Sequence, residues 1–185
     1  MTGLDLKADV IKNCNAAAVR YGYSGLHFEL GDINGYSCDT PVDIVMTLHA
    51  CDTATDYALY NALQWQAGLI LSVPCCQHEL NQQMHTDSFS AMTRYGIVKE
   101  RMAALMTDAI RANLLICAGY DTGILEFVDL SHTPKNLLIR AVKANISENT
   151  KKRAMEEIQN LLREFSVRPT LYTLLYGKEE TFQGK

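Results

Sequence analysis

Two short apolar runs, each followed at once by a polar cluster, constrain the fold of this chain more than any other stretch. The runs cover residues 42–47 and 68–73, and both consist mainly of aliphatic residues. Such runs are typical of parallel strands that are buried on both faces. Residues 55–66, between them, have the length and composition of a helix. The region is therefore predicted to form a βαβ unit.

The polar clusters at the ends of these runs are the first candidates for function. They read LHACDTATD at residues 48–56 and VPCCQHEL at residues 73–80. A right-handed crossover makes the two strands parallel, which puts both clusters at the same edge of the sheet. Open α/β sheets bind their ligands at that edge.

Composition limits the class of protein. With 185 residues, of which 48% are hydrophobic and 21% charged, the chain is expected to form a single domain, residues 1–185. A net charge of -4 gives no overall positive field to attract nucleic acid. We find neither a signal segment nor an apolar run of about 20 residues, so we expect a cytosolic protein with no membrane contact. The six cysteines suit reduced thiols.

The remaining periodicity predicts further elements along the chain. We expect strands at residues 2–6, 25–30, 123–128 and 168–175, and helices at residues 7–21, 82–118 (mostly helical) and 148–165. The last strand begins with a proline, which suits a sheet edge. Within the long helical region, core packing is predicted for a stripe at helical spacing: Ile97, Met102, Leu105, Met106 and Ile110.

Two acids stand just after predicted strands. Asp5 follows the first strand and Asp32 follows the second. Nucleotide-binding α/β folds bind ribose hydroxyls with an acid at this position. Asp5 by itself would favour a helix cap. Two acids in equivalent positions strengthen the interpretation as a nucleotide site.

This order of strands, acids and polar motifs resembles the class I S-adenosylmethionine-dependent methyltransferases, which have a Rossmann-like α/β sheet flanked by helices. More narrowly, the chain resembles a family of methyltransferase-like domains that combine LHACDTATD and VPCCQHE with an HTPKN loop, here residues 132–136. The resemblance covers nearly the whole chain. It implies methyltransferase activity with S-adenosylmethionine as cofactor and an RNA, small-molecule or protein acceptor. RNA is a candidate acceptor by analogy, because a tRNA ribose methyltransferase family has a similar pair of motifs.

The resemblance also implies roles for individual residues. Asp5, with Leu6 beside it, would bind the ribose of the cofactor. Asp32, with Ile33 beside it, would contact the adenine amino group.

For the other end of the cofactor, the resemblance implies that Leu48 and His49 flank the methionine and the methyl group. In the HTPKN loop, it implies substrate contacts for His132, Lys135 and Asn136.

The cluster at the sheet edge has three competing interpretations. In the favoured one, Asp52 or His49 takes a proton from the methyl acceptor, while Cys75, Gln77 and His78 shape the pocket. Such general-base help contributes a factor of about 10² to 10⁴. For Cys76 and Asp56, simple burial or helix capping explains the residue at least as well.

The two other interpretations concern the cysteines. Cys51 or Cys75 is a candidate covalent nucleophile, since some RNA cytosine methyltransferases place cysteines after the same two strands. Alternatively, two cysteines and two histidines bind zinc. The spacing lacks a Cys-x-x-Cys pair, so we predict no metal.

One departure from the family pattern concerns the start of the domain. Class I methyltransferases begin with a strand and a glycine-rich loop, for which we find no counterpart before Gly3. In the family order that strand lies between the strands ending at Asp5 and Thr47, so its loss would leave buried backbone groups unpaired at about 1 kcal/mol or more each.

We therefore expect an incomplete sheet that lacks the first strand and first helix. Our hypothesis is that the chain is the carboxyl-terminal part of a longer enzyme. Alternatively, another segment or a second protomer of a homo-oligomer completes the sheet. The rival function is a non-catalytic interaction domain on a methyltransferase scaffold.

Overall fold

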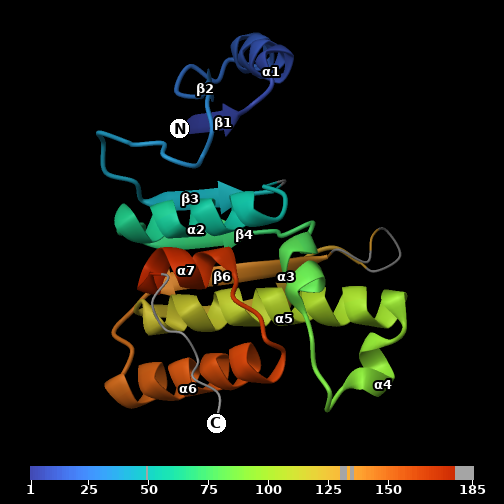
Figure 1. The fold of residues 1–185 in the computed structure, drawn as a ribbon. Coiled ribbons are helices and arrows are strands. Elements are labelled where there is room, and N and C mark those ends of the chain that lie inside the picture. Colours follow the sequence, from blue (N-terminus) through green and yellow to red (C-terminus); the bar gives the residue numbers. More distant parts are fainter. Residues whose placement is uncertain (49, 130–132, 134–135, 178–185) are drawn as a thin grey trace. The chain divides into compact units, whose positions relative to one another are not determined.

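The chain forms two compact units, residues 1–39 and residues 40–185, each with its own sheet. The computed structural model describes residues 1–48, 50–129, 133 and 136–177 (Figure 1). In this part of the chain, no helix is both long enough and apolar enough to cross a membrane.

The first unit is a small parallel strand pair with one helix. β1 (Thr2–Asp5) lies beside β2 (His27–Leu30), and α1 (Ala8–Arg20) connects them. The Asn15 side chain anchors α1 to β2, because it donates to the Phe28 carbonyl at 2.8 Å and accepts from the Phe28 amide at 2.9 Å. The three predicted elements of this region are confirmed.

The second unit contains a four-stranded sheet in the order β3-β4-β6-β5. β3 (Ile44–Thr47) and β4 (Leu69–Ser72) are parallel, and α2 (Thr53–Gln64) connects them, which confirms the predicted βαβ unit. β6 (Leu137–Lys143) lies antiparallel between β4 and β5 (Tyr120–Glu126). β6 is not among the strands that the sequence pattern predicts.

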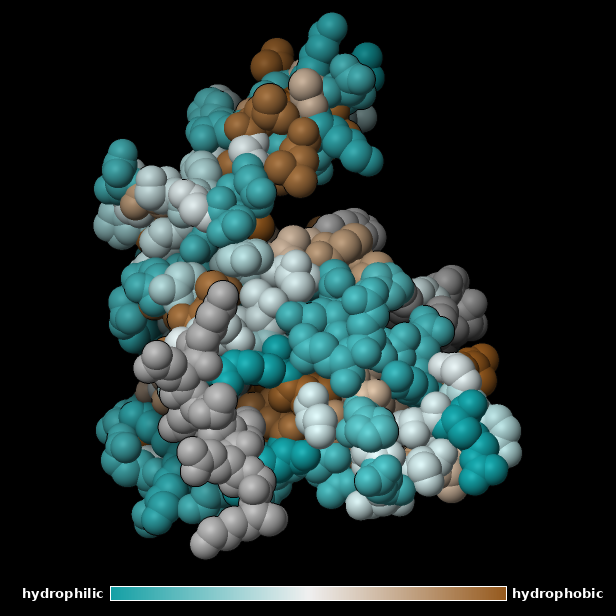
Figure 2. All heavy atoms as spheres, in the orientation of Figure 1, coloured by the Kyte–Doolittle hydropathy of each residue, from teal (hydrophilic) through white to brown (hydrophobic). Residues whose placement is uncertain are grey.

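Helices cover one face of this sheet (Figure 1). α2 contacts β3 and β4, and α5 (Gly96–Cys117) contacts β5 and β6. α7 (Thr170–Tyr176) packs on α2, and α6 (Glu148–Glu164) packs on α5. The short helices α3 (His78–Gln83) and α4 (Ser90–Thr93) contact α5. The outer surface on this side is mainly hydrophilic (Figure 2).

The strand register separates a core face from an open face. Paired residues on neighbouring strands share a face, and successive residues alternate between faces. The core face contains the buried Val45, Ile70, Ile139 and Ala141. We call the other side the open face; its residues are half-buried or exposed, and they are Ile44, Met46, Leu69, Leu71, Leu125, Leu138, Arg140 and Val142.

The open face is strongly apolar for a surface. Ile44 remains 52% exposed and Met46 57% exposed, although both belong to β3, which pairs parallel with β4. Parallel sheets are normally covered on both faces. Among the described residues, the helices of the second unit thus bury one face of the sheet and leave the aliphatic side chains of the other face uncovered.

The prediction of a strand at residues 168–175 is wrong, because these residues form α7. Its sequence, TLYTLLY, favours strand by local preference. Packing on α2 decides otherwise: Leu171 and Tyr172 are buried at 0% and 2% exposure, and Leu175 packs against the same core. The Glu79 carboxylate also accepts hydrogen bonds from the Thr170 amide and hydroxyl at the first turn.

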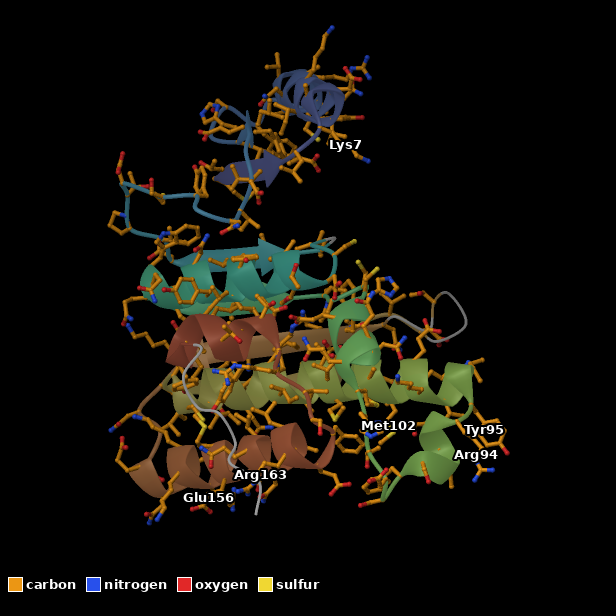
Figure 3. All side chains as sticks on the ribbon, in the orientation of Figure 1. Lys7, Arg94, Tyr95, Met102, Glu156 and Arg163 are labelled. Atoms are coloured by element: carbon orange, nitrogen blue, oxygen red, sulfur yellow. The ribbon has the colours of Figure 1, made fainter. Side chains whose placement is uncertain are left out.

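The predicted core stripe of α5 is only partly correct. Met106 and Ile110 are buried, and Met102 packs against the core. Ile97 and Leu105 are instead 63% and 60% exposed. On α6, by contrast, the two faces are clearly divided: Ala154, Ile158 and Leu162 are buried, whereas Glu156 and Arg163 project away from α5 (Figure 3).

Candidate functional site

The two predicted nucleotide-binding acids stand at the same end of the first unit's sheet. Asp5 is the last residue of β1, and Asp32 follows β2 by two residues. The Asp5 Oδ1 atom accepts a hydrogen bond from the Lys7 amide at 2.8 Å, and the Asp32 Oδ1 atom accepts one from the Asn34 amide at 2.9 Å. Each carboxylate thus orders its own turn and keeps a second oxygen as an acceptor.

Asp5 does not cap the following helix. The residue before α1 is Lys7, which makes no side-chain capping bond, so the helix-cap alternative is not what the structure shows. Beside the acids, Leu6 is exposed and Ile33 is half-buried. A pocket of about 280 Å³ in this unit, lined among others by Asn15 and His27, lies at the amino end of β2, away from both acids.

In the second unit, the polar clusters after β3 and β4 come together as the βαβ pattern predicts. The two strand ends are joined by a hydrogen bond between the Thr47 and Ser72 hydroxyls at 2.7 Å, and the Val73 amide donates to the Thr47 carbonyl at 2.8 Å. Beyond this junction, the Cys51 Sγ atom lies 3.1 Å from the Cys75 Sγ atom.

Cys76 completes a cluster of three thiols with Cys51 and Cys75. All three sulfur atoms lie within 4.8 Å of one another. Burial and the neighbouring thiols of Cys51 and Cys76 raise the pKa of the Cys75 thiol to about 12. Without a further activating group, Cys75 is therefore protonated at neutral pH and is a poor nucleophile.

Asp52 connects the two motifs. Its Oδ1 atom accepts from the Glu79 amide at 3.1 Å, and its backbone carbonyl accepts from Arg111 Nη2 at 2.9 Å. Its backbone has a φ of 53°, a conformation that non-glycine residues seldom adopt. Although Asp52 immediately precedes α2, its side chain does not cap that helix.

This loop is connected to a buried ionic network that the sequence motifs do not predict. Arg111 on α5 is 1% exposed and donates from Nε and Nη2 to the two carboxylate oxygens of Asp56, at 3.0 and 2.7 Å. Its Nη1 atom lies 3.3 Å from Asp108 Oδ1. Gln77 Nε2 donates to Asp108 Oδ2 at 3.1 Å. The network therefore links both motifs to α5.

Burial and charge oppose each other within this network. Burial raises the pKa of the Asp108 carboxyl to about 6, although Arg111 and Gln77 act in the other direction. For Arg111, burial lowers the pKa, but Asp56 and Asp108 outweigh it, so the guanidinium stays charged. The signal in the sequence is the pair Asp108 and Arg111, spaced by three residues on the inner side of an apolar helix.

The remaining described residues predicted for the site are exposed or half-buried. His78 is exposed at the first position of α3, and Leu48 is 60% exposed after β3. His49 lies outside the described residues. Gln77 is half-buried, and its side chain donates to Asp108.

Within the HTPKN loop, Asn136 has a structural role. Asn136 is 2% exposed, and its Nδ2 atom donates to the Val128 carbonyl at 2.9 Å. Its own carbonyl accepts from the Phe127 amide, also at 2.9 Å. Asn136 thus closes the base of the loop between β5 and β6. The predicted substrate contacts His132 and Lys135 lie outside the described residues.

Residues 1–83 match the family model of a methyltransferase domain. The match spans β1 to β4 and ends at Gln83, the last residue of α3. No curated protein and no solved structure matches the chain. For residues 1–83, the predicted likeness to a methyltransferase domain is confirmed.

Proposed function

We propose that this chain is a methyltransferase domain that uses S-adenosylmethionine. The observation with most weight is the pair of acids, Asp5 and Asp32, at the carboxyl ends of neighbouring parallel strands within residues matched to a methyltransferase domain. Acids at these positions bind the nucleoside part of a ligand in α/β folds. In this proposal, the first unit binds the adenosine part of the cofactor.

The chemistry of the residues fits adenosine. A ribose needs acceptors for its hydroxyl protons, and an adenine amino group needs an acceptor next to an apolar surface. Asp5 keeps Oδ2 as an acceptor while Lys7 holds Oδ1. Asp32 has the same arrangement with Asn34, and the half-buried Ile33 lies beside it. When bound, S-adenosylmethionine supplies a methyl group that is already activated for transfer.

The rim of the second unit is proposed to handle the methyl acceptor. Asp52 or His49 takes the proton of the attacking atom, and Leu48 offers an exposed apolar side chain to the methionine end. The Glu79 amide binds one oxygen of Asp52 and so holds this carboxylate in one orientation. Positioning of this kind contributes more than proton transfer when the methyl group is already activated.

The neighbouring motif is proposed to shape the acceptor surface through Cys75, Gln77 and His78. The bond from Gln77 to the buried Asp108 supports a positioning role for Gln77. The raised pKa of Cys75 speaks against the alternative in which this thiol attacks the acceptor covalently.

We further propose that the second unit belongs to a Rossmann-like methyltransferase sheet that is completed by an additional strand and helix. In the described part of the chain, β3 pairs only with β4. The carbonyls of Asp43 and Thr47 accept bonds from the β4 side, so the alternating backbone groups of Ile44 and Met46 are directed to the other edge.

The open face supports the same proposal. A strand that pairs with β3 would satisfy the backbone groups of Ile44 and Met46, and the helix that follows it would cover their side chains. If this chain is part of a longer enzyme, another segment of that enzyme would supply this strand and helix. A second protomer is the other source.

Calorimetric titration with S-adenosylhomocysteine tests the cofactor site. The titration is made with this chain and with a version that is extended upstream in the gene. We expect micromolar binding by the extended form. Asp5→Ala and Asp32→Ala should each weaken it by roughly 10- to 100-fold, the loss of a hydrogen bond to a charged group. Asp9→Ala, an exposed acid in the first turn of α1, is the matched control and should bind normally.

The outcomes separate the two candidate functions. The apolar open face also suits a non-catalytic interaction domain, because contiguous exposed apolar surface marks a contact site. If neither form binds S-adenosylhomocysteine, or if Asp9→Ala weakens binding as much as Asp5→Ala, the methyltransferase proposal fails and the interaction domain is favoured.

A further inference from the structure

Three thiols converge from two separate loops at the rim of the second unit. Cys51 follows β3, whereas Cys75 and Cys76 follow β4. Their sulfur atoms all lie within 4.8 Å of one another, and Cys51 and Cys75 approach to 3.1 Å. For comparison, two thiolates on one tetrahedral zinc ion, with zinc–sulfur bonds of about 2.3 Å, lie about 3.8 Å apart. The three sulfur atoms thus lie close enough together to reach a single small ion after small adjustments.

We propose that Cys51, Cys75 and Cys76 bind one zinc ion through three thiolates and leave its fourth position open. The sequence by itself predicts no metal, because it lacks a Cys-x-x-Cys pair and adjacent cysteines seldom bind one ion well. The only ligand set that it suggests is a mixed one of two cysteines and two histidines. The structure changes this prediction, since Cys51 supplies a sulfur from the neighbouring strand and the cluster consists of cysteines alone.

The loops that present the cysteines are fixed independently of any ion. Thr47 and Ser72 join the two strand ends by a hydroxyl bond of 2.7 Å. Beyond the cysteines, the Glu79 amide binds Asp52 and so ties the two loops together a second time. A preorganised ligand set loses little conformational freedom when it binds a metal.

The ligand set determines the kind of site. Zinc is bound well by thiolates, and three protein ligands with an open fourth position are typical of reactive rather than purely structural zinc sites. Among the described residues, no fourth histidine, cysteine or acid joins the cluster. Cys51 is exposed, so solvent or a soluble ligand such as a small thiol can reach the ion.

Binding requires no oxidant or reductant. Each of the three S–H groups transfers its proton to the buffer, and each sulfur donates an electron pair to the ion. The zinc centre then has a net charge of one negative unit. The proposal concerns the second unit only and is independent of cofactor binding.

The test is a zinc titration of the full chain after reduction and removal of metal, in competition with a chromophoric chelator. We expect one zinc ion per chain. Cys51→Ser, Cys75→Ser and Cys76→Ser should each weaken binding by more than the roughly 10- to 100-fold loss that follows removal of an outer-sphere partner. Cys117→Ser, at the end of α5, is the matched control and should bind zinc as the parent does.

A second readout identifies the ligands directly. Cobalt(II) added in place of zinc should give sulfur-to-metal charge-transfer absorption, which decreases in each of the three ligand variants but not in Cys117→Ser. Circular dichroism confirms that each variant is folded.

Two results would overturn the proposal. One is that the reduced chain binds no stoichiometric zinc. In that case a Cys51–Cys75 disulfide, detected after exposure to glutathione disulfide as a loss of two thiols, would identify a redox pair instead. The other is that a folded Cys51→Ser variant retains the parent affinity.

Discussion

Arg111 binds Asp56 through two parallel hydrogen bonds, Nε to Oδ1 at 3.0 Å and Nη2 to Oδ2 at 2.7 Å, and both side chains are about 1% exposed. The same guanidinium reaches the backbone of Asp52 and the carboxylate of Asp108. A single side chain on α5 therefore fixes the loop that precedes α2 and, through Asp108 and Gln77, the loop after β4.

Arg111→Met should destabilise the protein by about 3–5 kcal/mol, because it leaves the buried Asp56 carboxylate without a partner. Arg111→Lys keeps the charge but loses the two-pronged geometry, so its loss should be smaller. Urea unfolding measures both. Arg101→Met, an exposed arginine on the same helix, serves as control. A loss below about 1 kcal/mol for Arg111→Met would show that the network contributes little.

The stability of the protein should depend on pH through Asp108. Its pKa is raised from 3.8 to about 6 by burial, so between these values the folded state binds the proton more tightly than the unfolded state. The contribution of this group to stability is therefore present at low pH and is lost as the pH rises through about 6.

Asp108→Asn should remove this dependence. Between about pH 5 and pH 7, the free energy of unfolding of the variant should fall by about 1 kcal/mol less than that of the parent. Urea unfolding across this range measures the difference. Asp121→Asn, an exposed acid on β5, should follow the parent. Identical slopes for Asp108→Asn and the parent would contradict the assignment.

Glu79 should stabilise α7, the last helix that the structure describes. Its carboxylate accepts from the Thr170 amide at 3.0 Å and the Thr170 hydroxyl at 2.6 Å, so Glu79→Gln weakens both bonds at the start of α7. We expect a loss of about 1–2 kcal/mol in thermal or urea unfolding. Glu100→Gln, exposed on α5, should be neutral. If the two variants were equally stable, Glu79 would not contribute to the stability of α7.

The two faces of the sheet should respond differently to truncation. Ile70→Ala on the core face should cost about 2–5 kcal/mol, because Ile70 is fully buried. Met46→Ala on the open face should change stability by less than about 0.5 kcal/mol. Paired unfolding curves test this contrast. A comparable loss for Met46→Ala would mean that this face is covered in solution.

The sequence predicts the strands and helices of the matched region well, because their periodicity and their residue preferences agree. The prediction failed where tertiary packing outweighs local preference. Residues 170–176 prefer strand by composition, yet the Glu79 carboxylate and the apolar surface of α2 stabilise a helix. β6 was not predicted, because its pairing with other strands is not local in sequence. Its partner β4 lies far away along the chain, and a polar loop separates it from its other partner, β5.

The outline of the candidate site could be predicted because it depends on the topology of the sheet. A βαβ unit fixes where strand ends meet, so the proximity of Cys51 and Cys75 follows from topology. The contacts of Asp52 and Asp56 with Arg111 do not follow from topology, because Arg111 lies on a helix whose rotation is determined only by the packing of the core.

The position of β6 also has a consequence for how the protein assembles. β4 and β5 are not neighbours; each pairs with β6, so Ile70 meets Ala141 and Ile124 meets Ile139. During synthesis, β4 therefore emerges long before the strand that completes its edge. Such distant pairing slows folding and leaves an apolar strand edge exposed for longer. We expect the hairpin of β5 and β6 to form first and then to dock onto β4 as one piece, which makes this docking the step at which newly made chains are most exposed to aggregation.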